Sequence, residues 1–362
     1  MNASLIEPNL AALQQEPWAV AMQDCQHNSE EHHAEGDVWT HTQMVVEQIH
    51  SRPEYKDLSP SDQVVVFWAG ILHDVAKPTT ITVENGETHF PKHSIKGARR
   101  AREILNDRGF DWRTRERIAN LVRHHGHPPF VLQSENPISW AIDISWRVDT
   151  RLLYLLSMAD ALGRKAKDMK DYPERVELWR MLAEENNCFG QPYPFVNRQA
   201  RFLFFQDLLS SLYYTPFEDY KCEMTLLSGL PGVGKDTWIA KNLPEAPVVS
   251  LDDLRTKMDI DPTDNQGTVI QEAKQQVCRH LAAGTNFVFN ATNLMKLSRS
   301  KWIMLAHNYQ AMVRVVYLER PLSTIFEQNK QRDQVVPEQV IRGMQGVLEV
   351  PDLTECHELT EV

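Results

Sequence analysis

The glycine-rich segment GLPGVGKDT, residues 229–237, constrains the fold of this chain more than any other feature. It nearly matches the Walker A pattern of Gly, four residues, Gly, Lys and then Ser or Thr. The run EMTLLS precedes it and a helical pattern follows Lys235. Such a loop joins a strand to a helix, and its backbone N–H groups surround phosphate oxygens at the helix N-terminus. A glycine-rich turn without a ligand is disfavoured by this context, so the segment predicts a phosphate-binding loop.

The residue after Lys235 departs from that pattern, because Asp236 stands where Ser or Thr normally directs a hydroxyl to Mg²⁺. We expect Asp236 to face Mg²⁺ directly or through water, or to turn away so that Thr237 reaches the metal. A favourable interaction of Asp236 with the helix dipole is the competing interpretation. The predicted nucleotide and Mg²⁺ contacts are Gly229, Gly232, Val233, Gly234, Lys235, Asp236 and Thr237.

The chain after residue 222 alternates between two patterns. Strand-like runs occupy 223–229, 246–253, 285–293 and 311–320. Helical patterns follow Lys235, occupy 268–284 and 298–308, and begin again at Pro321 and Pro337. Alternating strands and helices predict an α/β domain with a parallel sheet and crossover helices.

Polar residues follow the strands of this predicted sheet. Asp252 and Asp253 come where a parallel strand opens into the ligand crevice, so either carboxylate could accept a proton from a hydroxyl; one of the pair is expected to N-cap the next helix. The third strand ends FNATNL, which brings Asn290 to this edge but no acidic residue. Arg332 could close over the phosphates as a lid, with a solvated helix face as the alternative.

Four segments of this half together resemble the P-loop 5′-hydroxyl polynucleotide kinases: GLPGVGKDT, SLDDLR, FNATNL and NKQRDQVVPEQVIRGM, within residues 223–350. The resemblance implies ATP or another NTP with Mg²⁺, and Asp252 as the general base. It implies that Arg255 binds the 3′-phosphate of the acceptor and that Lys235 and Arg332 stabilise charge on the transferred phosphate. The sequence departs from the family at two positions. Asp236 stands where the family commonly has Ser or Thr, and Asn290 stands where it commonly has Asp.

The first half predicts helices at 42–50, 61–77, 93–108, 112–125 and 149–168, and a hairpin at 81–90 around Asn85-Gly86. His73-Asp74, placed on a helix by this pattern, and His41 upstream are N and O ligands suited to a divalent metal. The further candidate ligands are His93, His124, His125 and Asp160. Separate structural roles for all of these residues are the less economical interpretation.

The segments HDVAKP, HSIKGARRA and SMADALGR resemble the HD phosphohydrolase superfamily, whose fold is all-helical. The resemblance implies a metal set formed by His41, His73, Asp74 and Asp160. A second ion would recruit His93 with His124 or His125, so one or two ions remain open. Lys77 and Arg164 are candidate phosphate contacts, although a solvated helix end is the competing interpretation for Lys77. Imidazole and carboxylate ligands suit Mn²⁺, Mg²⁺, Fe, Co²⁺ or Ni²⁺.

We therefore predict a multidomain chain, with an all-α HD domain at 1–187, a connector at 188–221 that packs between the domains, and an α/β P-loop kinase domain at 222–362. This fusion resembles the bacterial bifunctional end-healing enzymes of the HD-Pnk type. The resemblance implies a kinase that phosphorylates 5′-OH ends of RNA or DNA and a phosphoesterase that removes 2′,3′-cyclic, 2′- or 3′-phosphate, with a polynucleotide ligase as an expected partner. A nucleotidase fused to a nucleoside kinase, or a nucleotide-sensing regulator with a P-loop switch, stays open.

Charge and cysteine content restrict the remaining classes. A formal net charge of −11 disfavours non-specific binding of nucleic acid over a basic surface, but it does not exclude a local basic groove. Five scattered cysteines form no CxxC pair, and the first twenty residues lack the pattern of a signal peptide. No apolar run approaches the ~18 residues that span a bilayer. We expect a cytoplasmic protein that does not bind membranes.

Overall fold

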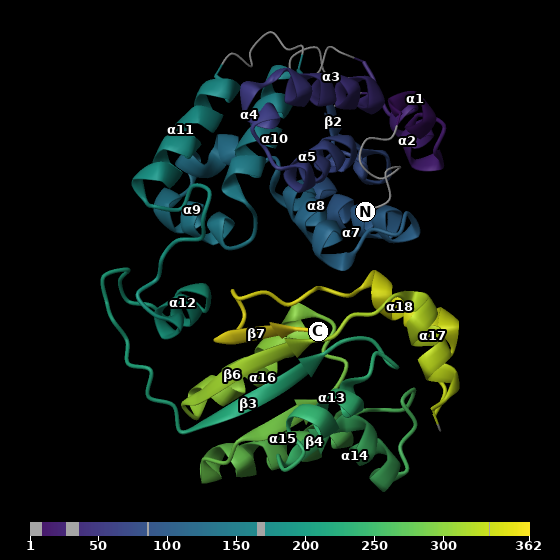
Figure 1. Cartoon of the computed structure of the whole chain (residues 1–362), viewed down its shortest axis with the longest axis vertical. Helices are drawn as coiled ribbons and strands as arrows, with labels where there is room; N and C mark the ends of the chain where they lie inside the picture. Colours follow the sequence, from purple (N-terminus) through teal and green to yellow (C-terminus); the bar gives the residue numbers. More distant parts are fainter. Residues whose placement is uncertain (1–8, 27–35, 85–86, 165–170, 333) are drawn as a thin grey trace. The chain divides into compact units, whose positions relative to one another are not determined.

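The computed structural model describes residues 9–26, 36–84, 87–164, 171–332 and 334–362. It divides into two compact units, Met1–Pro194 and Phe195–Val362 (Figure 1). The expected turn at Asn85-Gly86 and the end of the helix expected at 149–168 lie outside the described residues. The described residues of the first unit form helices and an antiparallel pair of short strands, and those of the second form a parallel sheet with helices, so the predicted fold class is confirmed.

The helices and strands of the first unit are α1 (Leu10–Leu13), α2 (Pro17–Gln23), α3 (Val38–Ser51), α4 (Pro53–Lys56), α5 (Pro60–Leu72), α6 (Lys77–Thr80), β1 (Thr82–Glu84), β2 (Glu87–His89), α7 (His93–Asp107), α8 (Trp112–His124), the 3₁₀ helix η2 (Pro128–Gln133), α9 (Pro137–Ser145), α10 (Thr150–Leu162) and α11 (Tyr172–Glu185).

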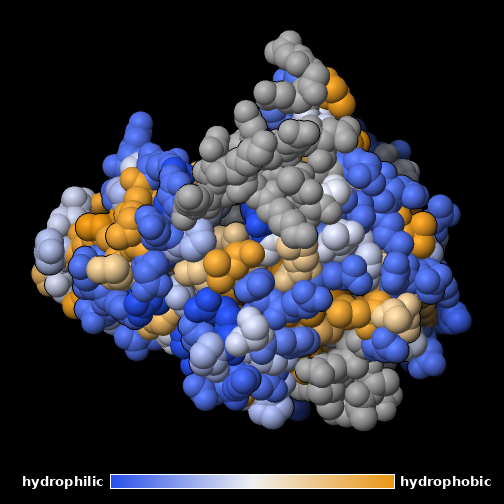
Figure 2. Space-filling view, turned by 90° about the horizontal axis from the view of Figure 1, so that it is seen from above, coloured by the Kyte–Doolittle hydropathy of each residue, from blue (hydrophilic) through white to orange (hydrophobic). Residues whose placement is uncertain are grey.

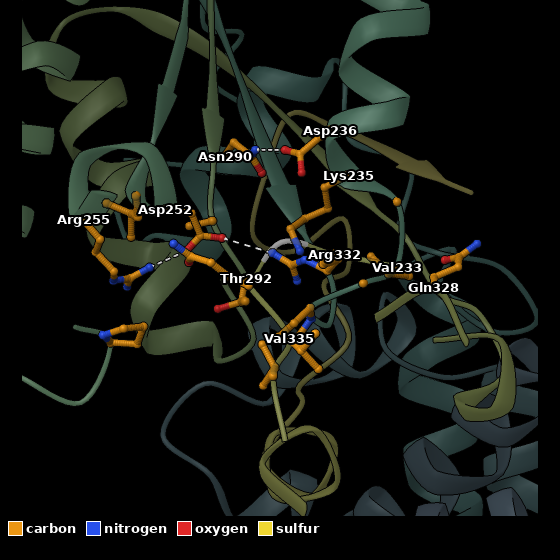
Figure 3. Close-up of a pocket in the computed structure, with 18 of the residues that line it drawn as sticks. Val233, Lys235, Asp236, Asp252, Arg255, Asn290, Thr292, Gln328, Arg332 and Val335 are labelled. Atoms are coloured by element: carbon orange, nitrogen blue, oxygen red, sulfur yellow. Dashed lines mark hydrogen bonds and ion pairs between the residues drawn. The ribbon is translucent and has the colours of Figure 1, made fainter. Parts of the chain in front are cut away.

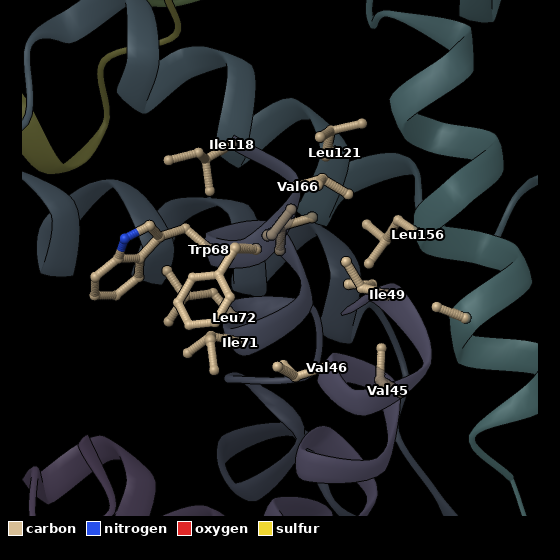
Figure 4. Packing of buried hydrophobic residues seen from close by; sticks show 14 of the residues in the cluster. Val45, Val46, Ile49, Val66, Trp68, Ile71, Leu72, Ile118, Leu121 and Leu156 are labelled. Carbon is tan, nitrogen blue, oxygen red and sulfur yellow. The ribbon is translucent and has the colours of Figure 1, made fainter. Parts of the chain in front are cut away.

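Helix α5 is the centre of this unit. Its apolar residues from Val64 to Leu72 are buried on every side, because α3, α8 and α10 all pack against it. Figure 4 shows side chains of these helices converging, among them Ile49 of α3, Leu121 of α8 and Leu156 of α10. A helix that is apolar all round is stable only when it is enclosed in this way.

Helix α5 ends earlier than the sequence pattern indicates. Ser59 caps its start by accepting a hydrogen bond from the Asp62 N–H, but the helix stops at Leu72 and the chain turns before Lys77. The backbone N–H of Val75 donates to Leu72 at 3.2 Å and that of Lys77 donates to Asp74 at 3.0 Å, which are three-residue turns. The prediction that His73 and Asp74 lie on a helix is therefore wrong: they form the corner after it.

The elements of the second unit are α12 (Arg198–Phe205), β3 (Cys222–Ser228), α13 (Lys235–Asn242), β4 (Val248–Ser250), α14 (Leu251–Met258), α15 (Gly267–Ala283), β5 (Phe287–Asn290), α16 (Lys296–Asn308), β6 (Ala311–Tyr317), α17 (Leu322–Lys330), α18 (Glu338–Gly346) and β7 (Glu358–Glu361).

The sheet has the order β4-β5-β3-β6-β7 with every pair parallel. Strand β3 is therefore central, and the loop after it opens between the ends of β5 and β6. Strand β4 is shorter than expected, since α14 already begins at Leu251. Ser250 caps α14 by accepting from the Asp253 N–H at 3.2 Å, so the expectation that Asp252 or Asp253 is the cap is wrong.

The segment between the two halves is shared by the two units. Residues up to Pro194 belong to the first, where the Thr150 hydroxyl donates to the Cys188 carbonyl at 3.1 Å. Helix α12 belongs to the second, where Arg201 donates to the backbone carbonyl of His357 at 2.5 Å and the Phe202 ring stacks on His357 with centroids 4.1 Å apart.

The surface in Figure 2 is mainly hydrophilic, with hydrophobic side chains in separate groups. Within the described part of the chain, no helix is both long and apolar enough to cross a membrane.

Candidate metal centre and nucleotide cleft

The loop after β3 has the backbone of a phosphate-binding loop. Gly229, Gly232 and Gly234 have φ values of 153°, 79° and 99°, which L side chains rarely adopt. A Cβ at Gly229 would lie 2.6 Å from the carbonyl oxygen of Leu318, so only glycine fits beside β6. Gly234 immediately precedes α13, which directs the first N–H groups of that helix toward the cleft.

Lys235 is the first residue of α13 and is half-buried. Its ammonium donates to the loop carbonyls of Gly229 at 3.1 Å and Leu230 at 3.0 Å. Burial lowers the pKa of Lys235 to about 8, although the carboxylates of Asp252 and Asp236 oppose the shift. A phosphate bound in the cleft would attract the Lys235 ammonium more strongly than these two neutral carbonyls do.

Asp236 and Asn290 meet across the cleft although they lie 54 positions apart in the chain. Strand β5 neighbours β3, so Asn290 at the end of β5 reaches the start of α13 and its Nδ2 donates to Asp236 Oδ1 at 2.6 Å. Asn290 is 8% exposed, and its Oδ1 has no hydrogen-bond partner among the described residues. Thr237 is exposed and also lines the cleft.

The predicted base lies between two arginines. Asp252 Oδ1 accepts from Arg255 at 2.5 Å, and Asp252 Oδ2 is 3.9 Å from the guanidinium of Arg332. Gln266 accepts from Arg255 Nε at 2.7 Å and fixes its plane. The Asp252 side chain is 65% exposed. Arg332 is only 30% exposed and lines the cleft, so it is directed into the cleft and does not lie on a solvated helix face.

These residues line one open cleft of about 1500 Å³ within the second unit. Figure 3 shows Lys235, Asp252, Arg255 and Arg332 gathered together, with the Asp236–Asn290 pair beside them. Gly232, Val233 and Gly234 also line it, whereas Gly229 lies behind the loop and shapes it. Asn293 is turned away, since its Nδ2 donates to the Leu227 carbonyl at 2.7 Å and braces β3.

Six histidine and aspartate side chains form a second candidate site in the first unit. The donor atoms fall into two groups, each within 4.8 Å: His41 of α3, His73 and Asp160 of α10; and Asp74, His93 and His125. The two groups adjoin, because Asp74 Oδ2 lies 3.1 Å from His73 Nε2 and Asp74 Oδ1 lies 3.6 Å from His93 Nε2. All six are among the seven candidates that the sequence offered, and His124 is the seventh.

Burial and neighbouring charges in this cluster favour the protonation states that bind a metal, which are ionised carboxylates and neutral imidazole. Burial opposes ionisation of Asp74, yet His73 and Lys77 hold the pKa of Asp74 well below its ordinary value. Burial likewise opposes ionisation of Asp160, whose pKa Arg164 and His41 hold well below its ordinary value. Burial and then His73 lower the pKa of His125 to about 3, so its imidazole is neutral.

The cluster fits a divalent cation. Asp74 Oδ1 is buried without a hydrogen-bond partner among the described residues, while His93 Nε2 and His125 Nε2 face it from 3.6 and 3.8 Å. Donor atoms bound about 2.1 Å from one ion stand roughly 3–3.5 Å apart, so these separations are close to those of a coordination shell. Two shells that share Asp74 would accommodate two ions.

Of the two adjacent histidines, His125 joins this cluster and His124 does not. His124 Nδ1 lies 3.1 Å from His127 Nδ1. Lys77 is buried, with its ammonium 2.8 Å from Asp74 Oδ2, so the interpretation of Lys77 as a solvated helix end is wrong. Arg164 contacts Asp160 Oδ2 at 2.8 Å.

The sequence did not single out two aromatic residues beside these cations. The Lys77 ammonium lies 5.1 Å from the centre of the Phe90 ring, and the Arg164 guanidinium lies 5.4 Å from that of Tyr172. Both contacts join separate elements, and a single sequence carries no local signal for them.

Two family models match separate parts of the chain. An HD domain model matches residues 38–162, and an AAA domain model matches residues 224–351. The first match contains the cluster of histidines and aspartates, and the second contains the cleft. The N-terminal unit thus contains a helical HD domain and the C-terminal unit a P-loop α/β domain, which implies a divalent metal in the first and a nucleotide with Mg²⁺ in the second.

Curated relatives include proteins named "Multifunctional CCA protein". The one from Pasteurella multocida (strain Pm70) is 28% identical over 180 residues, which is 48% of this chain and 39% of that protein. The one from Actinobacillus pleuropneumoniae serotype 5b (strain L20) is 29% identical over 155 residues, 40% of this chain and 35% of that protein. The chain thus spans about two fifths of the length of the curated relatives it matches.

Similar solved structures include a protein assigned as a kinase from Chloroflexus aurantiacus J-10-fl, with 15% identity and a TM-score of 0.34. It covers 40% of this chain, and the alignment covers 85% of that protein. A gluconokinase from Sinorhizobium meliloti 1021 has 17% identity and a TM-score of 0.29 over 40% of this chain and 83% of that protein.

Proposed function

We propose that this protein repairs the two ends of a broken polynucleotide. Its P-loop domain transfers the γ-phosphate of ATP or another NTP to a 5′-OH end. Its HD domain removes a 2′,3′-cyclic, 2′- or 3′-phosphate from the opposite end. A strand broken by transesterification carries both of these ends, and a polynucleotide ligase requires the 5′-phosphate and 3′-OH that the two reactions leave.

The position of Asp252 between Arg255 and Arg332 carries the proposal. A carboxylate beside the phosphate-binding loop suits an acceptor hydroxyl, whose proton it accepts. Arg255, held by Gln266, supplies a cation on the far side of that carboxylate from Arg332. An acceptor with a phosphate near its hydroxyl matches this arrangement, as does a polynucleotide 5′ end, whereas a free nucleoside offers Arg255 no anion.

Each residue of the cleft has a separate role in the transfer of the phosphoryl group. Lys235 and the loop N–H groups hold the β- and γ-phosphates, and Arg332 neutralises charge on the phosphate in transit. Asp252 takes the proton of the 5′-OH as the new P–O bond forms and the bond to the nucleoside diphosphate breaks. Bound Mg²⁺ supplies further neutralisation of the phosphates.

In the HD domain, the exposure of the donors indicates the direction of approach. His93 is 29% exposed, whereas the other five donor side chains are at most 6% exposed, so a terminal phosphate approaches beside His93. Lys77 and Arg164 orient Asp74 and Asp160 and are positioned to contact the phosphate. Bound divalent ions supply Lewis acidity toward the phosphate ester and toward water.

The test uses one RNA that has a 5′-OH and a 2′,3′-cyclic phosphate, incubated with labelled ATP and with Mg²⁺, Mn²⁺, Co²⁺ or Ni²⁺. We expect label at the 5′ end and loss of phosphate from the other end. Free nucleosides and nucleoside 3′-phosphates are offered in parallel as acceptors. Label on free nucleosides only would contradict a polynucleotide acceptor, and release of no phosphate with any metal would contradict the phosphoesterase.

The role of Arg255 has its own matched control. Arg255→Ala should raise the KM for a nucleoside 3′-phosphate while the KM for ATP stays unchanged. Arg279→Ala, which removes an exposed arginine outside the cleft, should change neither. Equal losses for acceptors with and without a 3′-phosphate would show that Arg255 acts through Asp252 or the fold and not through the phosphate of the acceptor.

A further inference from the structure

We propose that Asp236 on α13 and Asn290 on β5 both bind the Mg²⁺ of this cleft, with the usual chemical types of the two positions reversed. Asp236 provides the carboxylate, and Asn290 provides the neutral oxygen. The proposal rests on the kinase function above and names how that site binds its metal. It has a consequence beyond metal placement: the loop should reject nucleotide that carries no Mg²⁺.

The exchange follows from the two positions together. In P-loop NTPases a Ser or Thr hydroxyl after the lysine and an acidic residue on a neighbouring strand hold the metal. Here the position after Lys235 carries Asp236, and the end of the neighbouring strand β5 carries Asn290. One carboxylate and one neutral oxygen are thus both retained, with their positions reversed.

The geometry supports a joint role for the two side chains. Asn290 Nδ2 lies 2.6 Å from Asp236 Oδ1, and both residues line the cleft with Lys235 (Figure 3). Asn290 is 8% exposed, and its Oδ1 has no hydrogen-bond partner among the described residues. A buried amide oxygen without a donor costs free energy, and a cation or its water shell would satisfy it. Amide and carboxylate oxygens are also the ligands that Mg²⁺ prefers.

The charge of Asp236 then makes metal a condition of nucleotide binding. A hydroxyl at this position is neutral, so a loop that has Ser there meets phosphate without repulsion. Asp236 instead places a carboxylate beside the phosphates. Two like charges about 6 Å apart repel enough to lower the affinity roughly tenfold when the effective dielectric constant is about 40, between that of a protein surface and that of water. Mg²⁺ between them reverses the sign of this interaction.

The competing roles of Asp236 make different predictions. If Asp236 only stabilises the N-terminus of α13 through the helix dipole, its removal changes thermal stability by a small amount and leaves metal dependence as it was. If Thr237 holds the metal instead, Thr237→Ala and not Asp236→Ser should weaken binding of Mg²⁺-ADP.

The experiment measures ADP affinity by isothermal titration calorimetry, once with Mg²⁺ and once with EDTA, on the full chain. For Asp236→Ser we expect ADP in EDTA to bind roughly tenfold more tightly and Mg²⁺-ADP roughly tenfold more weakly than for the wild type. Asp236→Asn serves as a second variant of nearly equal shape. Glu245→Ser removes an exposed carboxylate outside the cleft and should change neither affinity.

The exchanged double variant is the decisive arm. Asp236→Ser with Asn290→Asp restores the usual arrangement, so Mg²⁺-ADP affinity should return to within about threefold of the wild type. The inference is overturned, and the kinase proposal is not, if the wild type binds Mg²⁺-ADP while both Asp236 variants keep its ratio of affinities in Mg²⁺ and EDTA. Failure of the wild type to bind ADP in either condition overturns both proposals.

Discussion

Nucleotide binding should draw a proton onto Lys235. In the free protein, burial lowers the pKa of Lys235 from 10.5 to about 8, and only two loop carbonyls accept its hydrogen bonds. A bound phosphate favours the charged ammonium and raises the pKa again. At pH 8.5 about three quarters of free protein molecules have a neutral Lys235, so each ADP bound should take up about 0.75 proton.

The same titration sets the direction of the pH dependence. Because only the protonated lysine pairs with phosphate, the affinity for ADP should fall as the pH rises through 8, by about 25-fold between pH 7.5 and 9.5. The stability of the free protein should move in the opposite direction. Between pH 8 and 10.5, Lys235 binds fewer protons in the folded chain than in the unfolded chain. Burial of the charged lysine therefore destabilises the folded protein fully below pH 8, and this destabilisation is lost as the pH rises from 8 to 10.5.

Calorimetry in two buffers with different ionisation enthalpies measures the proton uptake directly. The phosphates of ADP are already ionised at pH 8.5, so they contribute no proton of their own. Lys241→Met removes an exposed lysine that also lines the cleft, and the uptake should persist in this control. Uptake near zero at pH 8.5 in the wild type would refute the reasoning, since it would show that Lys235 is already charged before the nucleotide binds.

Three further outcomes are expected. Asp252→Ala should lower 5′ phosphorylation at least about a hundredfold and leave phosphate removal intact, while Asp74→Ala does the reverse; a loss of both activities from either variant in an end-labelling assay would contradict two separate sites. His125→Ala should lower the metal content measured by mass spectrometry, whereas His124→Ala should leave it unchanged, because only His125 faces the other donors. Gly229→Ala should lower the free energy of unfolding by at least about 2 kcal/mol, measured with urea, since its Cβ would lie 2.6 Å from a backbone carbonyl oxygen.

The α/β half shows what a local pattern predicts well. The run before Gly229 and the helix after Lys235 are adjacent in sequence, so the phosphate-binding loop could be read directly. The sequence pattern does not predict strand β7, because ELTE is short, has three polar residues among its four and becomes a strand only through pairing with β6. Tertiary pairing, rather than intrinsic preference, decides such segments.

The cluster of histidines and aspartates shows what a local sequence pattern cannot predict. The residue types and their distribution indicated seven candidate donors, but not which of His124 and His125 lies with the other five. Consecutive residues near a helix end differ by about 100° in direction, and the packing of α8 against α5 and α7 decides which one faces Asp74. The corner at His73 likewise depends on the turns after α5, which the apolar pattern of residues 61–77 does not indicate.

The contacts of helix α12 have a practical consequence for producing the second unit on its own. Arg201 and Phe202 bind the segment around His357, which precedes the last strand of the sheet. A fragment that starts at residue 222, where the sheet begins, would leave the His357 ring without its stacking partner and two backbone carbonyls without their donor. We therefore expect a fragment that begins before Asn197 to fold as an autonomous unit and one trimmed to the sheet to aggregate.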